Sequence, residues 1–307
     1  MSDQFDVGIV GGGPAGLSAS IFLARYLHSV VLIDSGDPRN WETRGVNAYL
    51  GLPSVKPAEL RARGRDEARK YGVHFVDDCV DEAVRVSDDE FWLITHSGDE
   101  FRVPRVLLAI GLKDVWPEIP GLERAYGATA HVCPDCDGYE ARGKKTVVIG
   151  RGRKAVGMAL NLTTWTQDIV ICTNGLPPQL DEPEYCSKLD ALNIPVLTDR
   201  VNRIRVHDRD VLYLELGSGM ELDVEKIFFA IGQYPADDLG AKLGCQRDEG
   251  GHIVVDKHYH TSVRNVFAAG DIVPGSQLAI AAAADGAIAA LAIHKSLVPA
   301  GRKLLPA

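Results

Sequence analysis

The hydrophobic pattern at the start of the chain predicts a strand, a turn, a helix and a second strand. A short β-branched run at 6–10 leads into a glycine-rich turn, an apolar helical pattern follows, and another β-branched run covers 29–34. Short apolar runs separated in this way by glycine and a helix are typical of buried parallel strands. The first 34 residues therefore predict one βαβ unit.

The same pattern returns about one domain later in the chain. Residues 146–150 predict a strand, 155–165 a helix and 168–173 a further strand. Two other apolar runs, at 106–111 and 227–232, both end in Ala-Ile-Gly. Each lies where a dinucleotide-binding domain returns to its cofactor, so the repeat concerns a whole functional unit.

The two units predict an α/β protein made of two Rossmann-like, three-layer dinucleotide-binding domains, the second inserted into the first. A proline-rich stretch after residue 115 is typical of a linker, and later strand-like runs at 252–256 and 265–273 precede a last helix. We therefore expect the first domain to comprise 1–115 and 245–307, and the inserted domain 116–244.

Composition and charge narrow the functional classes. The chain has 307 residues, 46% of them hydrophobic, with 33 Lys and Arg against 42 Asp and Glu, a net charge of −9. This acidic balance argues against a broad nucleic-acid-binding face. The apolar stretch at 278–293 is rich in alanine and predicts a buried helix rather than a membrane span. Because no basic and apolar leader precedes the first strand, we expect a cytoplasmic protein.

Two of the six cysteines, Cys133 and Cys136, form a Cys-x-x-Cys pair. Thiols three residues apart at a helix start can close a disulfide and exchange it with other thiols. A zinc site would need a second such pair or suitably spaced histidines. The sequence therefore predicts a redox-active pair and no metal site.

The first glycine-rich turn fits the pattern G-x-G-x-x-G between a strand and a helix. Such a turn brings the backbone close to a pyrophosphate at a helix N-terminus, and Asp34, at the end of the next strand, can accept from ribose hydroxyls. Near the C-terminus, Asp271 on a glycine turn suits a ribityl hydroxyl, and a helix from about Gln277 would point its N-terminus at a flavin ring. We therefore expect FAD at this first site.

Four motifs, GGGPAGLSAS, CPDCDG, VVIGRGRKAVG and TSVRNVFAAGD, follow one another along the chain. In this order they resemble the low-molecular-weight thioredoxin reductase-like family of FAD disulfide oxidoreductases. The resemblance implies a homodimer, an FAD domain and a redox pair on the inserted domain. It also implies that Cys136 lies nearer the flavin, that Cys133 exchanges with an external disulfide or dithiol, and that Asp137 transfers protons during exchange.

The cofactor contacts that the first glycine turn and the resemblance imply all lie in the predicted FAD domain. They are Gly11, Gly13, Pro14, Ala15, Gly16, Asp34, Ser35, Asn47, Ala109, Gly111, Gly270, Asp271, Gln277, Leu278 and Ala279. One stretch departs from the family: where its members have an Asn-aromatic-Pro-Gly step, this chain reads Asn47-Ala48-Tyr49-Leu50-Gly51.

A second glycine loop carries three cations. Gly150, Arg151, Gly152, Arg153, Lys154 and Ala155 fit G-x-G-x-x-A and are a possible second nucleotide or donor site. A pyridine-nucleotide site also needs a selector at the end of the next strand, basic for NADPH and acidic for NADH. Thr173 and Asn174 stand there, and 172–186 contains no Lys, Arg or His. In this the chain resembles family members that lack the NADPH-binding motif, the ferredoxin-dependent or deeply rooted thioredoxin reductases.

Three interpretations of the second loop remain open. We expect foremost a thioredoxin reductase-like enzyme that is not driven by NADPH, with ferredoxin as a possible donor and a thioredoxin-like protein as substrate. A dithiol oxidase that forms a disulfide in a small metabolite and passes electrons to oxygen would lack the same selector. An NADPH-dependent thioredoxin reductase with an atypical site is the third.

Overall fold

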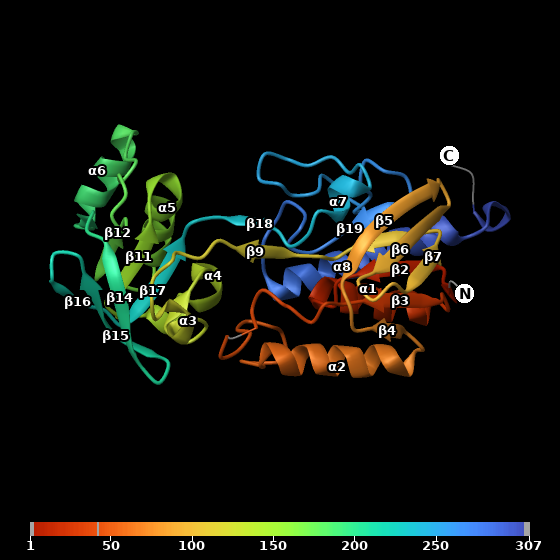
Figure 1. Ribbon diagram of the computed structural model, residues 1–307, viewed down its shortest axis with the longest axis horizontal. Helices are drawn as coiled ribbons and strands as arrows, with labels where there is room; N and C mark the ends of the chain where they lie inside the picture. The colour runs from red at the N-terminus through yellow and green to blue at the C-terminus, as the bar shows by residue number, and fades with distance from the viewer. Residues whose placement is uncertain (1–2, 42, 304–307) are drawn as a thin grey trace. The chain divides into compact units, whose positions relative to one another are not determined.

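The computed structural model describes residues 3–41 and 43–303, and the chain divides into two compact units (Figure 1). Unit 1 comprises Met1–Trp41, Pro57–Lys113 and Tyr234–Ala307, and unit 2 comprises Glu42–Lys56 and Asp114–Gln233. The chain passes between them through β9 (Leu112–Asp114) and β18 (Gln233–Pro235), which pair with each other. Unit 2 is therefore an insertion in the sequence of unit 1.

Unit 1 is built on a five-stranded parallel sheet. Its strand order is β19 (Val266–Ala268), β8 (Val106–Leu108), β2 (Val7–Val10), β3 (Val30–Ile33) and β4 (His74–Val76). A second sheet has the order β1 (Asp3–Gln4), β7 (Glu100–Val103), β6 (Glu90–Thr95) and β5 (Val80–Ser87). Helices α1 (Pro14–Arg25), α2 (Pro57–Lys70), α7 (Leu239–Lys242) and α8 (Ala279–Leu297) and the 3₁₀ turn η2 (Ala300–Arg302) complete the unit.

The alternation of side chains along β2 and β3 places the parallel sheet between two layers. Val7 and Ile9 of β2 belong to the core cluster shared with α1 and α8, whereas Val10 belongs to the cluster shared with the second sheet. A Cβ added to Gly8 would lie 2.6 Å from Leu93 of β6, so glycine permits close contact between the sheets. Alternate side chains point to opposite faces of the sheet, and both faces are buried. This accounts for the continuous apolar runs in the sequence.

Unit 2 repeats this three-layer plan. Its parallel sheet has the order β10 (Ala130–His131), β17 (Lys226–Ala230), β11 (Thr146–Gly150), β12 (Ile169–Cys172) and β13 (Val196–Leu197). An antiparallel sheet consists of β14 (Val201–His207), β15 (Asp210–Leu216) and β16 (Glu221–Asp223). The helices are α3 (Leu122–Ala125), α4 (Pro134–Asp137), α5 (Gly152–Leu162) and α6 (Pro183–Ala191), with the 3₁₀ turn η1 (Tyr139–Ala141).

Several details differ from the pattern expected from the sequence. Residues 43–56, expected in the first domain, group with unit 2, and the strand expected at 265–273 is limited to β19. The units divide at Gln233 rather than after residue 244, because Leu239 and Leu243 of the α7 region pack into the core of unit 1. The strand expected at 252–256 is reduced to a single bridge between Ile253 and Arg247. Its backbone bonds to irregular segments instead, with the Ile253 N–H donating to the Ile272 carbonyl oxygen and the Val254 N–H to the Gln246 carbonyl oxygen.

Helix α8 is apolar enough and long enough to cross a membrane, by length and composition alone. In the structure the small residues of one face pack against α1 in the core of unit 1, so α8 is only partly the buried helix that the sequence predicted. The closest approach is at Gly286, where an added Cβ would lie 2.0 Å from the carbonyl oxygen of Ala15. The small residues of α8 thus allow α1 to begin directly beside it.

We predict that Gly286→Ala destabilises unit 1 by about 1–3 kcal/mol, because α8 must move away from α1 to accommodate the new methyl group. Denaturant unfolding followed by circular dichroism measures the change. Gly301→Ala is the control, since nothing lies within 4 Å of the Cβ that it adds. Equal unfolding midpoints for the two variants would contradict the close helix packing.

Candidate active site

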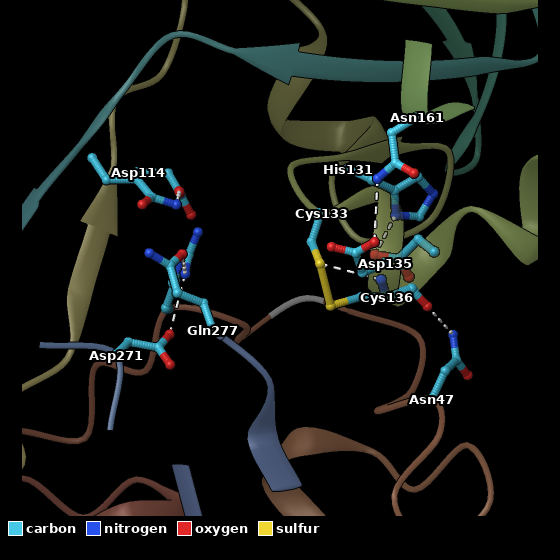
Figure 2. Close-up of a disulfide and its surroundings, with 12 residues drawn as sticks. Asn47, Asp114, His131, Cys133, Asp135, Cys136, Asn161, Asp271 and Gln277 are labelled. Atoms are coloured by element: carbon cyan, nitrogen blue, oxygen red, sulfur yellow. Dashed lines mark hydrogen bonds and ion pairs between the residues drawn. A yellow bond between two sulfur atoms is a disulfide. The ribbon is translucent and has the colours of Figure 1, made fainter. Parts of the chain in front are cut away.

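The cysteine pair lies at the start of the short helix α4, just after β10. Cys133 and Cys136 form a disulfide with their Cα atoms 5.3 Å apart (Figure 2). Cys133 is the N-cap residue of α4, and its Sγ accepts a hydrogen bond from the backbone N–H of Cys136 at 3.2 Å. This hydrogen bond closes the first turn of α4 around the disulfide.

Side chains from three other segments hold α4 in place. Asn161 of α5 donates to Asp135 Oδ1 at 3.2 Å, and Asn47 Nδ2 donates to the carbonyl oxygen of Cys136 at 3.4 Å (Figure 2). A Cβ added to Gly138 would lie 2.5 Å from both the Pro134 carbonyl oxygen and the Trp165 ring. Glycine is therefore required where α4 turns into the next segment, with the indole packed against it.

Two basic side chains that the sequence analysis did not identify lie behind Asp137. His131 is 4% exposed, and its Nδ1 lies 3.4 Å from Asp137 Oδ2. Lys226, at the start of β17, is 8% exposed, and its Nζ lies 3.4 Å from His131 Nε2. A lysine opening the apolar run KIFFA, and a histidine two residues before the first cysteine, were the available sequence signals.

In unit 1, the first glycine loop has the shape that the sequence predicted. Gly11 has φ +105° and an added Cβ there would lie 2.2 Å from the Ala109 carbonyl oxygen, while at Gly16 it would lie 1.9 Å from the Gly11 carbonyl oxygen. Gly13 differs, because its φ of −75° suits any residue and nothing lies within 4 Å of an added Cβ. Neither conformation nor packing requires glycine there, and the missing side chain leaves room for a ligand to approach the backbone.

The residues around this loop also fit a dinucleotide. Helix α1 starts at Pro14 with no side-chain cap, so no side chain accepts from its first backbone N–H groups. These groups lie beside the open space at Gly13. Asp34 is buried and accepts from the Gly12 N–H at 3.0 Å, and Arg61 of α2 donates to its other oxygen at 2.9 Å. Arg61 was missed because it lies far along the chain from the loop. Ser35, next to Asp34, is exposed.

The Asp271 turn lies beside the same helix start. A Cβ added to Gly270 would lie 2.9 Å from the Cβ of Ala15. Arg39, another residue not identified from the sequence, donates to Asp271 Oδ2 at 3.1 Å and to Gln277 Oε1 at 2.8 Å. Leu278 is the N-cap of α8 and Ala279 its first residue, again with no side-chain cap.

The remaining predicted contacts fall in two places. Ala109 and Gly111 follow β8, close to the first glycine loop through the contact of Gly11 with Ala109. Asn47 belongs to unit 2, where it contacts the cysteine loop as described above. Unit 1 thus brings together the glycine loop, the acid after β3 and the Asp271 turn, the parts that an FAD pyrophosphate, ribose and ribityl chain require.

The second glycine loop, in unit 2, is covered by its own chain. The N–H of Gly152, the first residue of α5, donates to the Pro178 carbonyl oxygen at 2.9 Å, and Gln179 lies 3.5 Å from the Cβ that Gly152 lacks. Ala155 and Gly150 are buried. The three cations of the loop, Arg151, Arg153 and Lys154, are exposed.

The selector positions after β12 serve the fold of that covering segment. Thr173 is buried and its hydroxyl donates to the Leu176 carbonyl oxygen, while Asn174 Oδ1 accepts from the Val201 N–H at 2.8 Å. Within 3–41 and 43–303, no group of three or more His, Cys, Asp or Glu side chains is placed to hold a metal ion.

These features define a two-domain dinucleotide-binding oxidoreductase with a redox-active disulfide, and comparison with known proteins agrees. The family model described as pyridine nucleotide-disulphide oxidoreductase matches residues 5–286. Thioredoxin reductase from Bacillus subtilis is 27% identical over 305 residues, 96% of each chain. The 34.2 kDa protein in the rubredoxin operon of Clostridium pasteurianum is 29% identical over 304 residues, 95% of this chain and 97% of that protein.

Solved structures give the same result. The crystal structure of HlmI has a TM-score of 0.91 at 33% identity and covers 96% of this chain and 93% of that chain. A putative thioredoxin reductase TrxB from Bacillus anthracis has a TM-score of 0.89 at 29% identity, covering 95% and 98%. The expected fold class, two Rossmann-like α/β domains, is confirmed.

The chain belongs to the pyridine nucleotide-disulphide oxidoreductase family. It is an FAD-dependent disulfide oxidoreductase of the thioredoxin reductase-like kind, as the resemblance predicted, and FAD is its cofactor.

We predict that Gly13→Val leaves the stability of the apoprotein unchanged but weakens FAD binding at least about tenfold, because the side chain fills the space that the cofactor needs. Titration of apoprotein with FAD, followed by flavin fluorescence, measures the affinity. Gly157→Ala is the matched control, since it also has nothing within 4 Å of an added Cβ but lies on α5. Normal FAD affinity in Gly13→Val would show that FAD does not bind close to the Gly13 backbone.

Proposed function

We propose that this protein is a cytoplasmic thiol–disulfide oxidoreductase that passes electrons between FAD and the Cys133–Cys136 pair and on to the disulfide of a thioredoxin-like protein, without NADPH as its donor. Unit 1 would hold the cofactor, through the residues at Gly11–Gly16, Asp34 and Asp271. Bound FAD would supply the two-electron redox chemistry that reduces the cysteine pair.

The contrast between the two glycine loops supports the absence of NADPH dependence. Both loops join a strand to a helix in the same βαβ plan. In unit 1, nothing lies within 4 Å of the position of an added Gly13 Cβ. In unit 2, the first N–H of α5 already donates to the Pro178 carbonyl oxygen at 2.9 Å. A nucleotide phosphate would use an N–H group in this position.

The residues after β12 support the same conclusion. A 2′-phosphate is bound by arginine or lysine at this position, and a 2′-hydroxyl by a carboxylate. Thr173 and Asn174 are neutral, and both are hydrogen-bonded within unit 2. A pyridine nucleotide would have to displace the covering segment and would then find no selector for its ribose.

The chain's own groups can carry out the exchange. In the reduced pair, the Cys133 thiolate attacks the substrate disulfide, forms a mixed disulfide with one sulfur and releases the other as a thiolate. The Cys136 thiol passes its proton to Asp137 and its sulfur attacks Cys133 of the mixed disulfide. The second substrate sulfur leaves as a thiolate and takes the proton from Asp137, which balances the reaction.

The exposed cations of the second loop suit an acidic protein donor. Arg151, Arg153 and Lys154 gather at the start of α5 and are open to solvent. Ferredoxins are commonly acidic. They carry one electron at a time, so two encounters would be needed for the two-electron reduction of the flavin. Charge complementarity at such a surface mainly raises the association rate and is weakened by salt.

We expect reduced ferredoxin to bleach the flavin of the oxidised enzyme at least about a hundredfold faster than NADPH or NADH, because the covered loop excludes the nucleotides. Anaerobic stopped-flow absorbance measures the rates. Cys133→Ser is the control for exchange, since it should accept electrons at the flavin yet fail to reduce thioredoxin. Fast bleaching by NADPH would refute the donor assignment, and bleaching by a small dithiol with peroxide formed in air would favour a dithiol oxidase.

We also propose that the enzyme is a homodimer, with α8 at the interface. Ile280, Ile288 and Leu291 are each 38–39% exposed although they are large and apolar. Their spacing of eight and three residues puts them on one helix face, opposite the small residues that pack on α1. An exposed apolar stripe of this kind is typical of a protein interface.

Ile288→Glu should weaken dimerisation by about 2 kcal/mol or more, because a carboxylate would be buried at the interface. Sedimentation velocity across a concentration series measures the dissociation constant. Leu212→Glu, an exposed apolar position on β15 of unit 2, should leave the dimer intact. A wild-type protein that sediments as a monomer, or a variant that dimerises normally, would contradict the interface.

A further inference from the structure

The sheet of unit 2 brings a histidine and a lysine together behind the cysteine pair. Strands β10 and β17 are parallel neighbours, with His131 opposite Phe228. Lys226 lies two residues before Phe228, so its side chain emerges on the same face of the sheet. Lys226 Nζ donates to the Ala128 carbonyl oxygen at 3.0 Å and lies 3.4 Å from His131 Nε2. Both side chains are buried, so their contacts are with protein groups.

These contacts determine which nitrogen of His131 carries the proton. A lysine ammonium group can only donate hydrogen bonds, so Nε2 is the acceptor and the ring proton is on Nδ1. Nδ1 is buried and has no hydrogen-bond partner, and it lies 3.4 Å from Asp137 Oδ2. A small rotation of either side chain would make this contact a hydrogen bond. The N–H dipole of His131 therefore points from the lysine toward the carboxylate.

A nearby carboxylate stabilises the charged form of Lys226. Burial lowers the pKa of Lys226, and the nearby Arg44 lowers it further, whereas Asp137, Glu140 and Asp210 act in the opposite direction. Asp210 is engaged with Arg44 at 2.8 Å, and both are more than half exposed. Asp137 is only 15% exposed, so solvent screens its interaction with the buried cation less.

We propose that Lys226 and His131 form a buried relay that places a positive charge behind the Asp137 carboxylate, the group that the proposed function assigns to accept the thiol proton. His131 and Lys226 keep their own protons throughout and act as positioning residues. The proton moves from the Cys136 thiol to Asp137 and then to the departing substrate thiolate. This inference rests on the proposed function, which assigns the proton transfer to Asp137.

The test is the pH dependence of exchange in the reduced, FAD-loaded enzyme. The protein is reduced anaerobically with dithiothreitol, freed of it by gel filtration, and mixed with 4,4′-dithiodipyridine, a neutral aromatic disulfide, from pH 4.5 to 9.5. Lys226→Met and His131→Leu should each move the acid limb of the rate profile upward by about one pH unit. The first removes the positive charge and the second removes the ring that connects it to Asp137, so the ionised form of Asp137 is less favoured in both. Asp137→Asn should abolish this limb.

Conservative variants separate the relay from a merely structural role. Lys226→Arg keeps the charge and His131→Gln keeps one donor and one acceptor, so both should restore most of the wild-type limb. His207→Leu and Lys188→Met, exposed positions of the same unit, should leave the profile unchanged. FAD content and melting temperature show whether each buried variant is folded.

The outcomes distinguish this relay from the proposed function. If Asp137→Asn alters the limb while Lys226→Met and His131→Leu follow the wild-type profile, the relay is overturned and the proposed function stands. If Asp137→Asn itself follows the wild-type profile, the assigned role of Asp137 fails and the relay fails with it. Failure of His131→Gln and Lys226→Arg to restore the limb, with FAD content intact, would also overturn the relay.

Discussion

The first N–H groups of a helix have no partner within the helix and must find an acceptor elsewhere, and this constraint separates the two halves of the chain. Helix α1 starts without a side-chain cap at a glycine whose conformation and surroundings do not require glycine. Helix α5 starts without a side-chain cap as well, but there a carbonyl oxygen from residue Pro178 accepts from its first N–H. The start of α1 is thus left open to an anionic cofactor, whereas the chain itself supplies an acceptor at the start of α5.

The environment of the cysteine pair follows from a different kind of constraint. Helix α4 has only four residues, so it cannot position the thiols by itself and depends on Trp165, Asn47 and Asn161 around it. Asp137, its last residue, likewise lies against His131 of β10, which in turn contacts Lys226 of β17. The chemistry of a short motif is therefore set largely by residues distant from it in sequence.

This distribution explains how much could be predicted from the sequence. Both βαβ units, the two glycine loops and the cysteine pair are local patterns, and the predicted strands at 6–10 and 146–150 appear as β2 and β11. His131 and Lys226 were missed because they meet only through the pairing of β10 with β17, which no local pattern indicates. The contact of Asn47 with the cysteine loop also joins segments that are far apart in the sequence. The segment 234–244 belongs to unit 1 because the α7 region packs into its core.

The second loop shows how the architecture of a dinucleotide fold can by itself require a glycine motif. The glycines remain because the turn from β11 into α5 needs them: Gly152 has φ +60°, and at Gly150 an added Cβ would lie 2.9 Å from the Ala230 carbonyl oxygen. A glycine motif can thus be required for structural reasons, whether or not a phosphate binds beside it. The three cations of the same loop are exposed at the start of α5, so they are not needed for this packing.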